Sequence, residues 1–147
     1  MPTPEAQLEA FLAKYRADVA DTGRAAIAHM RARLPSWDAL AYDNYNALAV
    51  GFSPNGSKKL LVLSIALYPR WVSPFVSAKL DDSLGLLKGS GTTVRHVVMT
   101  GGAGDLERPE LAAFVDQTIA RANSMIDPAR SGELRIISVS AKQRPRQ

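Results

Sequence analysis

The chain has 147 residues, of which 46% are hydrophobic and 22% are charged, and these proportions are ordinary for a globular domain. It contains no cysteine, which excludes disulfides, thiol catalysis and thiolate metal sites. No apolar run reaches the roughly 18 residues of a membrane span, and the first residues lack the basic and then hydrophobic pattern of a secretory signal. We therefore expect a single cytoplasmic domain, residues 1–147, with one core and no membrane partner.

The formal net charge of +4 is concentrated at the end of the chain. Lys142, Arg144 and Arg146 lie in the basic tail, residues 141–147, which has no acid. Without these three, the 18 lysines and arginines fall to 15, against 14 acids, so the rest of the chain is close to neutral. We expect a solvated tail, and the charge distribution argues against nucleic acid as a partner.

The first part of the chain predicts two amphipathic helices. Thr3 is a suitable N-cap, Pro4 suits the first helical position, and apolar residues recur at helical spacing over residues 4–20. Residues 21–23 interrupt this pattern, and a second apolar stripe follows and ends before Pro35. Each helix needs a surface against which to bury its apolar side.

Most of the remaining chain predicts strands. Five segments are short and rich in apolar or β-branched residues, at residues 42–53, 60–68, 71–77, 92–99 and 133–140. The first two flank turn residues and predict a β-hairpin, and the prolines around the third predict an edge strand. A third helix begins between residues 105 and 109 and ends before Asp127. This order predicts a two-layer α+β domain, with an antiparallel sheet of about five strands and helices on one face.

Side chains alternate across a strand, so the hairpin predicts a sheet with two unlike faces. The large-residue face carries aliphatic and aromatic side chains that each gain roughly 1.5–3 kcal/mol on burial, namely Leu48, Val50, Phe52, Leu61, Leu63, Ile65 and Leu67. We expect the helices to cover it. The small-residue face carries Ala47, Ala49, Gly51, Ser64 and Ala66, edged by Asp43, Tyr45 and Tyr68.

The small-residue face predicts a shallow hollow with a polar, aromatic rim. Small floor residues leave room, and tyrosines combine apolar contact with a hydrogen-bonding group. We therefore predict that this face binds a small molecule or a protein partner through the rim residues Asp43, Tyr45, Tyr68, Arg70 and Trp71. The alternative is that a helix, the tail or the second subunit of a homodimer covers this face.

A glycine-rich segment, LLKGSGTTVRH, is similar to a phosphate-binding loop at first sight. The P-loop needs a lysine after its last glycine and then a helix, whereas Lys88 precedes Gly89 and a strand is predicted after Gly91. A turn into a strand is therefore the simpler interpretation. We keep Lys88 and Arg95 as candidate anion contacts.

Catalytic and metal-binding patterns are absent from the sequence. The two histidines, His29 and His96, have no partner at i, i+4 spacing, and there is no G-x-S-x-G elbow. We assign no catalytic residue, no metal ligand and no cofactor. Asp43 with Tyr68 is the one pairing that we nominate for acid–base chemistry, should the chain be an enzyme.

Four segments carry a resemblance to a known family, in the order YDNYNALAVGFSP, SIALYPRWV, LLKGSG followed by VR, and SVSAKQRPR. They span roughly residues 20–146 and resemble the YdhG-like family, a bacterial domain of unknown function. The resemblance implies a two-layer α+β fold with an antiparallel sheet, similar in layout to secretion chaperones. It brings no established catalytic residues.

Some relatives in this family are described as frataxin-like iron chaperones, which implies an alternative function with iron as the ligand. Hard metal ions need clustered carboxylates. The first helix carries Glu5, Glu9, Asp18 and Asp21, but basic residues dilute this acidic ridge. The leading prediction is therefore a non-enzymatic binding domain, with an iron chaperone second and an enzyme of unknown reaction third.

Overall fold

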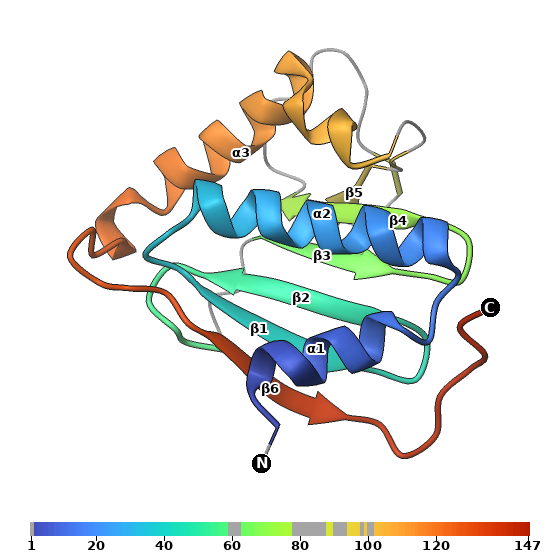
Figure 1. Ribbon diagram of the computed structural model, residues 1–147. Coiled ribbons are helices and arrows are strands. Elements are labelled where there is room, and N and C mark those ends of the chain that lie inside the picture. Colours follow the sequence, from blue (N-terminus) through green and yellow to red (C-terminus); the bar gives the residue numbers. More distant parts are fainter. Residues whose placement is uncertain (1, 59–62, 78–87, 90–93, 98, 100–101) are drawn as a thin grey trace.

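The computed structural model (Figure 1) describes residues 2–58, 63–77, 88–89, 94–97, 99 and 102–147. The helices in these residues are α1 (Pro4–Leu12), α2 (Ala17–Arg33), α3 (Pro109–Arg121) and the short 3-10 helices η1 (Ala103–Glu107) and η2 (Asn123–Met125). The strands are β1 (Asp38–Asp43), β2 (Leu48–Ser53), β3 (Leu63–Leu67), β4 (Val72–Ser77), β5 (Val94–His96) and β6 (Leu134–Val139).

The described strands form one sheet in the order β5-β4-β3-β2-β1-β6. Every neighbouring pair is antiparallel except β1 and β6, which are parallel. The two-layer α+β prediction is confirmed, but the sheet is mixed and not purely antiparallel. The physical reason is the connection into β6, because a chain that returns through a helix such as α3 can enter the sheet in either direction, whereas a tight hairpin forces antiparallel pairing.

The predicted strand at residues 42–53 is wrong, because the chain turns inside it. Residues 38–43 form β1 and residues 48–53 form β2, and the two strands pair antiparallel from Asp38 opposite Ser53 to Asp43 opposite Leu48. The Asn44 amide donates to the Ala47 carbonyl at 3.0 Å and closes the turn. β1 lies in the sheet interior, between β2 and β6.

The predicted edge strand at residues 71–77 is β4, which pairs with both β3 and β5. Pro74 does not prevent this. Its carbonyl accepts a hydrogen bond from the Val97 amide at 3.1 Å, on the β5 side. The N–H that proline lacks would point to the same side, so the ladder with β3 stays intact.

The first predicted helix, residues 4–20, is also wrong, because it breaks into α1 and the start of α2. The Thr3 hydroxyl caps α1 by accepting from the Ala6 amide at 3.1 Å, as predicted. Residues 21–23 do not end a helix but lie inside α2. Gly23 is required there because a Cβ at this position would lie 2.4 Å from the Leu67 side chain. α2 therefore packs very closely on β3.

The helices cover the large-residue face of the sheet, as Figure 1 shows for α1 and α2, with α3 beside α2 towards the β4 and β5 edge. The side chains predicted for this face are buried in one core: Leu48, Val50, Phe52, Leu63, Ile65 and Leu67. Leu61 lies outside the described residues. The predicted sidedness of the hairpin is thus confirmed for the part that the structure describes.

The small-residue face lies on the side of the sheet away from these helices. Tyr42, Ala49, Ala66 and Ser73 follow one another across four strands in one cross-strand row. Ala66 and Ser73 are buried, and Tyr42 and Ala49 are half-buried. At the end of β3 this face continues into Tyr68, which brings the candidate site to the turn between β3 and β4.

Candidate ligand-binding site

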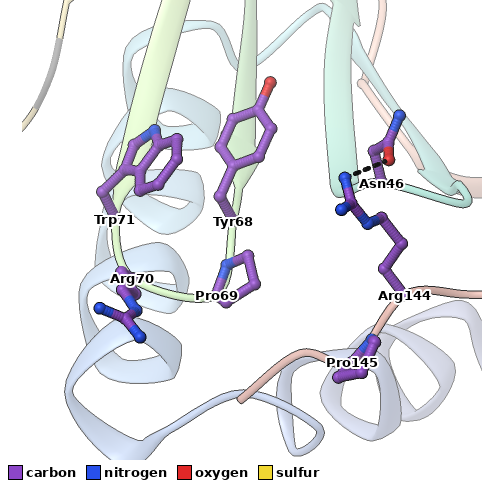
Figure 2. A pocket seen from close by; sticks show the side chains of 7 residues that line it. All are labelled: Asn46, Tyr68, Pro69, Arg70, Trp71, Arg144 and Pro145. Carbon is purple, nitrogen blue, oxygen red and sulfur yellow. Dashed lines mark hydrogen bonds between the residues drawn. The ribbon is translucent and has the colours of Figure 1, made fainter.

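Three segments meet at one end of the sheet and enclose an open hollow of about 610 Å³ (Figure 2). They are the β3–β4 turn, the β1–β2 turn and the C-terminal segment after β6. We call this feature the Trp71 hollow, and its lining residues are Asn46, Tyr68, Pro69, Arg70, Trp71, Arg144 and Pro145. The hollow lies beyond the ends of the strands and not on the middle of the sheet face.

An aromatic pair forms one wall of the Trp71 hollow. The Tyr68 amide donates to the Trp71 carbonyl at 2.9 Å, which closes a tight turn and places the two side chains on the same face. Their rings stack with centroids 4.8 Å apart and planes 20° apart. Burial raises the pKa of Tyr68, so its hydroxyl stays uncharged at neutral pH. Trp71 is 43% exposed, which leaves a large apolar surface open to a ligand.

Two guanidinium groups also line the Trp71 hollow. Arg70 and Arg144 are exposed, and neither forms an ion pair with a carboxylate among the residues that the structure describes. Arg144 makes a long contact of 3.4 Å from Nη1 to Asn46 Oδ1 (Figure 2). The described lining contains no acid, so this end of the sheet carries uncompensated positive charge.

Arg70 and Trp71 also border a second hollow, of about 410 Å³, on the side of α2. Its lining includes Asp18, whose carboxylate accepts from the Arg16 guanidinium at 3.0 Å, and Met99, which is buried. The Trp71 hollow is the one that contains most of the predicted rim, namely Tyr68, Arg70 and Trp71.

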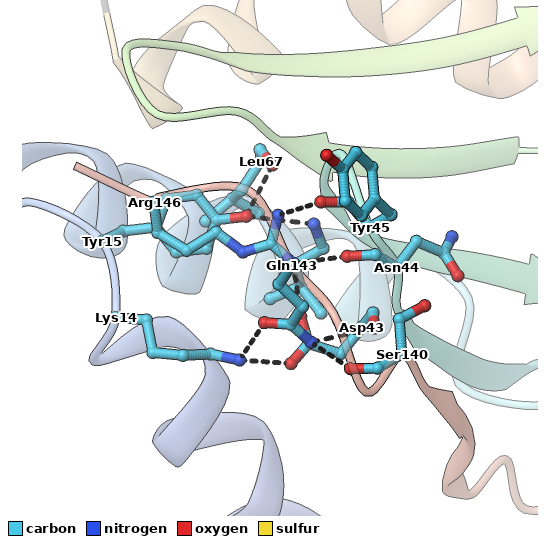
Figure 3. A network of polar contacts seen from close by, with 10 residues as sticks. Lys14, Tyr15, Asp43, Asn44, Tyr45, Leu67, Ser140, Gln143 and Arg146 are labelled. Carbon is cyan, nitrogen blue, oxygen red and sulfur yellow. Dashed lines mark hydrogen bonds and ion pairs between the residues drawn. The ribbon is translucent and has the colours of Figure 1, made fainter.

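A buried ion pair holds the C-terminal segment in place (Figure 3). Arg146 is 5% exposed and donates from Nη2 to Asp43 Oδ1 at 2.9 Å and to the Asn44 carbonyl at 2.6 Å. Lys14, from the turn after α1, donates to Asp43 Oδ2 at 2.5 Å and to Gln143 Oε1 at 2.7 Å. We call Lys14, Asp43, Gln143 and Arg146 the C-terminal anchor.

Tyr15 connects the C-terminal anchor to the core. Its hydroxyl donates to the Leu67 carbonyl at 2.8 Å and accepts from the Leu48 amide at 3.0 Å. The Arg146 guanidinium lies 5.6 Å from the centroid of the Tyr15 ring. Burial raises the pKa of Tyr15, whose hydroxyl is fully used in this bridge. Because Arg146 is fixed in this way, the two residues before it, Arg144 and Pro145, are held as a wall of the Trp71 hollow.

The structure brings together three of the predicted rim residues, Tyr68, Arg70 and Trp71, in the Trp71 hollow. Tyr45 is exposed in the β1–β2 turn but does not line the hollow. The prediction that Asp43 edges the small-residue face is wrong. It belongs to β1, shares a cross-strand row with Leu48 and Leu67, and is fully buried on the helix side. The nominated pairing of Asp43 with Tyr68 is therefore wrong.

The two candidate anion contacts from the glycine-rich segment are not in the Trp71 hollow. Lys88 is exposed and its backbone pairs with that of His96, at the edge of the sheet. Arg95 pairs with Val76 in the β4–β5 ladder, and its side chain lies outside the described part of the structure. Anion binding by these two residues stays a prediction.

The sequence-based prediction did not include four of the lining residues, Asn46, Pro69, Arg144 and Pro145. The tail was predicted to be solvated, and the burial of Arg146 shows that this was wrong for its end. The contact between Arg146 and Asp43 joins positions 103 residues apart in the chain. No local pattern in a single sequence specifies such a contact. The one signal in the sequence was that the tail contains no acid, so its basic residues have no partner within the tail itself.

Three of the four acids considered for iron, Glu9, Asp18 and Asp21, form ion pairs with nearby arginines. Arg24 donates to both carboxylate oxygens of Glu9, at 2.7 and 2.9 Å, and to Asp21 at 2.8 Å. The hydrogen bond from Arg24 lowers the pKa of Glu9. Among the described residues, no group of three or more histidine, aspartate or glutamate side chains is arranged to hold a metal ion.

Comparisons with known protein families, curated proteins and solved structures give no match for this chain. The resemblance to the YdhG-like family therefore stays a prediction. None of the helices in the described part of the chain has the length and apolar character that a membrane crossing requires.

Proposed function

We propose that the chain is a non-enzymatic binding domain and that the Trp71 hollow is its ligand site. One observation carries this proposal: a stacked aromatic pair and two arginines without a described carboxylate partner face the same open hollow. Tryptophan, tyrosine and arginine are the residue types that contribute most to binding energy at protein surfaces. The proposed site thus includes three of the predicted rim residues, Tyr68, Arg70 and Trp71, but it lies at the ends of the strands and not on the sheet face.

The chemistry of the lining favours an anionic ligand with an apolar part. The Arg70 and Arg144 guanidiniums present several donors in a planar fork that matches carboxylate or phosphate groups. Trp71 and Tyr68 offer flat apolar surface, and two prolines add rigid apolar walls. The volume of about 610 Å³ falls within the range of small-molecule sites, about 300–1,000 Å³.

The same lining supports binding in preference to catalysis. General acid–base chemistry uses mainly histidine and carboxylates, and the described lining of the Trp71 hollow contains neither. In this lining, burial raises the pKa of Tyr68, so its hydroxyl is a weaker acid than usual. The buried carboxylate nearest in sequence to the β1–β2 turn, Asp43, is committed to the C-terminal anchor.

A thermal-shift screen tests this proposal. Nucleotides, sugars, acyl compounds and metal ions are added to the wild type and to Trp71→Ala, at concentrations well above the expected dissociation constants. A ligand that binds only the folded chain raises the unfolding temperature by mass action. We expect an anionic compound to raise it in the wild type and not in Trp71→Ala. A ligand that stabilises both proteins equally would place the site elsewhere and contradict the proposal.

A further inference from the structure

The aromatic wall of the Trp71 hollow has room for one more ring. In Figure 2 Tyr68 lies between Trp71 on one side and Arg144 with Asn46 across the hollow. Trp71 and Tyr68 are already stacked at 4.8 Å. A flat ring laid on the open side of Tyr68 would extend this stack towards Arg144.

The hollow also has a place for a strongly anionic group. Arg70 and Arg144 have no described carboxylate partner, and the nearby acids are used elsewhere, Asp18 by Arg16 and Asp43 by Arg146. Guanidinium groups bind phosphate through two parallel hydrogen bonds, which gives both affinity and orientation. A cationic ligand would be repelled by the same two groups.

The remaining lining residues favour an aromatic anion over simpler ligands. An aliphatic carboxylate or inorganic phosphate would leave the stacked rings uncovered, and a neutral sugar would leave both guanidiniums without a counter-charge. The Asn46 amide can both donate and accept hydrogen bonds, which suits the edge of a heteroaromatic ring. A volume of about 610 Å³ admits a ring, a sugar and a phosphate together.

The position of the tail removes the argument against nucleotides that the charge distribution gave. The sequence predicted a solvated tail. In the structure Arg146 is anchored, and Arg144 faces the hollow beside the aromatic pair. A basic residue next to an accessible aromatic ring is a combination that binds single-stranded nucleic acids.

From this juxtaposition, and resting on the proposed function, we infer that the ligand of the Trp71 hollow is a nucleotide, with its base stacked on Tyr68 and its phosphate held by Arg144. The same chemistry is offered by a free mononucleotide and by a single-stranded nucleic acid.

Isothermal titration at low ionic strength tests this inference with probes that each lack one part of a nucleotide. AMP carries both parts, adenosine lacks the phosphate, and ribose phosphate lacks the base. We expect AMP to bind, and each partial probe to bind about tenfold or more weakly, because stacking and the phosphate contact each contribute to affinity. Equal affinity for AMP and ribose phosphate would overturn the inference.

Matched variants show whether AMP binding depends on the Trp71 hollow or on the positive charge of the segment in general. Arg144→Gln and Lys142→Gln remove one exposed positive charge from the same segment, but only Arg144 lines the hollow. We expect Arg144→Gln and Trp71→Ala to weaken AMP binding about tenfold or more, and Lys142→Gln to change it less than about twofold. Equal losses in the two charge variants would indicate non-specific attraction and overturn the inference.

Two further comparisons complete the test. The first asks whether the ligand is a free nucleotide or a single-stranded nucleic acid, and the second separates failure of the nucleotide inference from failure of the proposed function. An oligouridylate of about eight nucleotides that binds tenfold more tightly than UMP supports a single-stranded nucleic acid, and equal affinity supports a free nucleotide. If no nucleotide binds while another anion in the thermal-shift screen requires Trp71, the nucleotide inference fails and the proposed function stands. If no compound in either experiment depends on Trp71, both fail.

Discussion

Arg144 and Arg146 lie two residues apart in one segment, and their surroundings are opposite. Arg146 is buried, and its guanidinium is held by Asp43, by the Asn44 carbonyl and over the Tyr15 ring. Arg144 is exposed, and its side chain makes one long contact with a neutral amide. The segment thus has one arginine whose partners come from the chain itself and one that has no carboxylate partner among the described residues.

The difference follows from the cost of burying charge. A guanidinium removed from water needs a carboxylate and further hydrogen bonds, and Arg146 Nη2 has both, from Asp43 and from the Asn44 carbonyl. An exposed guanidinium next to stacked aromatic rings needs no internal partner and gives little to stability. We therefore expect substitutions in the C-terminal anchor to change the free energy of unfolding, and substitutions in the Trp71 hollow to change ligand binding.

The largest effect is expected for Asp43→Asn. It leaves Arg146 buried without a counter-charge, and breaking a buried pair in this way costs about 3–5 kcal/mol. Chemical denaturation with urea measures the loss. The double variant Asp43→Asn with Arg146→Met should recover part of it, because it removes the unpaired charge as well. A loss below about 1 kcal/mol for Asp43→Asn would mean that Arg146 is not held as described.

A smaller loss, about 2 kcal/mol, is expected for Asp38→Asn. Asp38 is a second buried carboxylate, which accepts from Arg130 and from the Glu133 amide, both at 2.9 Å. Burial alone would raise the pKa of Asp38, but these hydrogen bonds outweigh it and lower the pKa below its ordinary value near 3.8.

The pH dependence of the free energy of unfolding checks the prediction for Asp38→Asn. Because the pKa of Asp38 is lower in the folded chain than in the unfolded chain, its contribution is present above about pH 4 and is lost as the pH falls through the folded value. The free energy of unfolding should therefore fall less between pH 5 and pH 2 in Asp38→Asn than in the wild type. Identical acid profiles would show that Asp38 has no lowered pKa.

Variants in the Trp71 hollow should separate binding from stability. Trp71→Ala loses one exposed stack and should cost about 1 kcal/mol, and Arg144→Gln should stay within about 0.5 kcal/mol of the wild type. Thermal unfolding without ligand measures both values. If Arg144→Gln lowered the free energy of unfolding by several kcal/mol, Arg144 would contribute to stability as Arg146 does, and the contrast between the two arginines would be wrong.

The smallest effect is expected on the surface of the helices. Glu9→Gln removes an exposed pair with Arg24 and should cost about 0.2–1 kcal/mol, and less at high salt. Because Arg24 occupies both Glu9 and Asp21, we expect no saturable ferrous iron binding at micromolar concentration in isothermal titration. Micromolar binding that is lost when Glu5, Glu9, Asp18 and Asp21 are replaced would favour the iron-chaperone alternative.

The sequence was sufficient where one short segment decides the outcome. Alternation along β3 predicts correctly that Leu63 and Ile65 face the helices. It was insufficient where distant segments meet. The turn at Asn44 moved Asp43 to the other face, and only the folded chain shows that Arg146 lies against it.

The central claim, that the Trp71 hollow is a ligand site, is tested most directly by fluorine NMR of the protein labelled with fluorotryptophan. The chain has two tryptophans, and Trp37 is 5% exposed in the core while Trp71 is 43% exposed in the hollow. During titration with an anionic aromatic compound such as AMP, the account predicts that the Trp71 signal moves to saturation and the Trp37 signal stays fixed. A Trp71 signal that does not move with any ligand that stabilises the protein would contradict it.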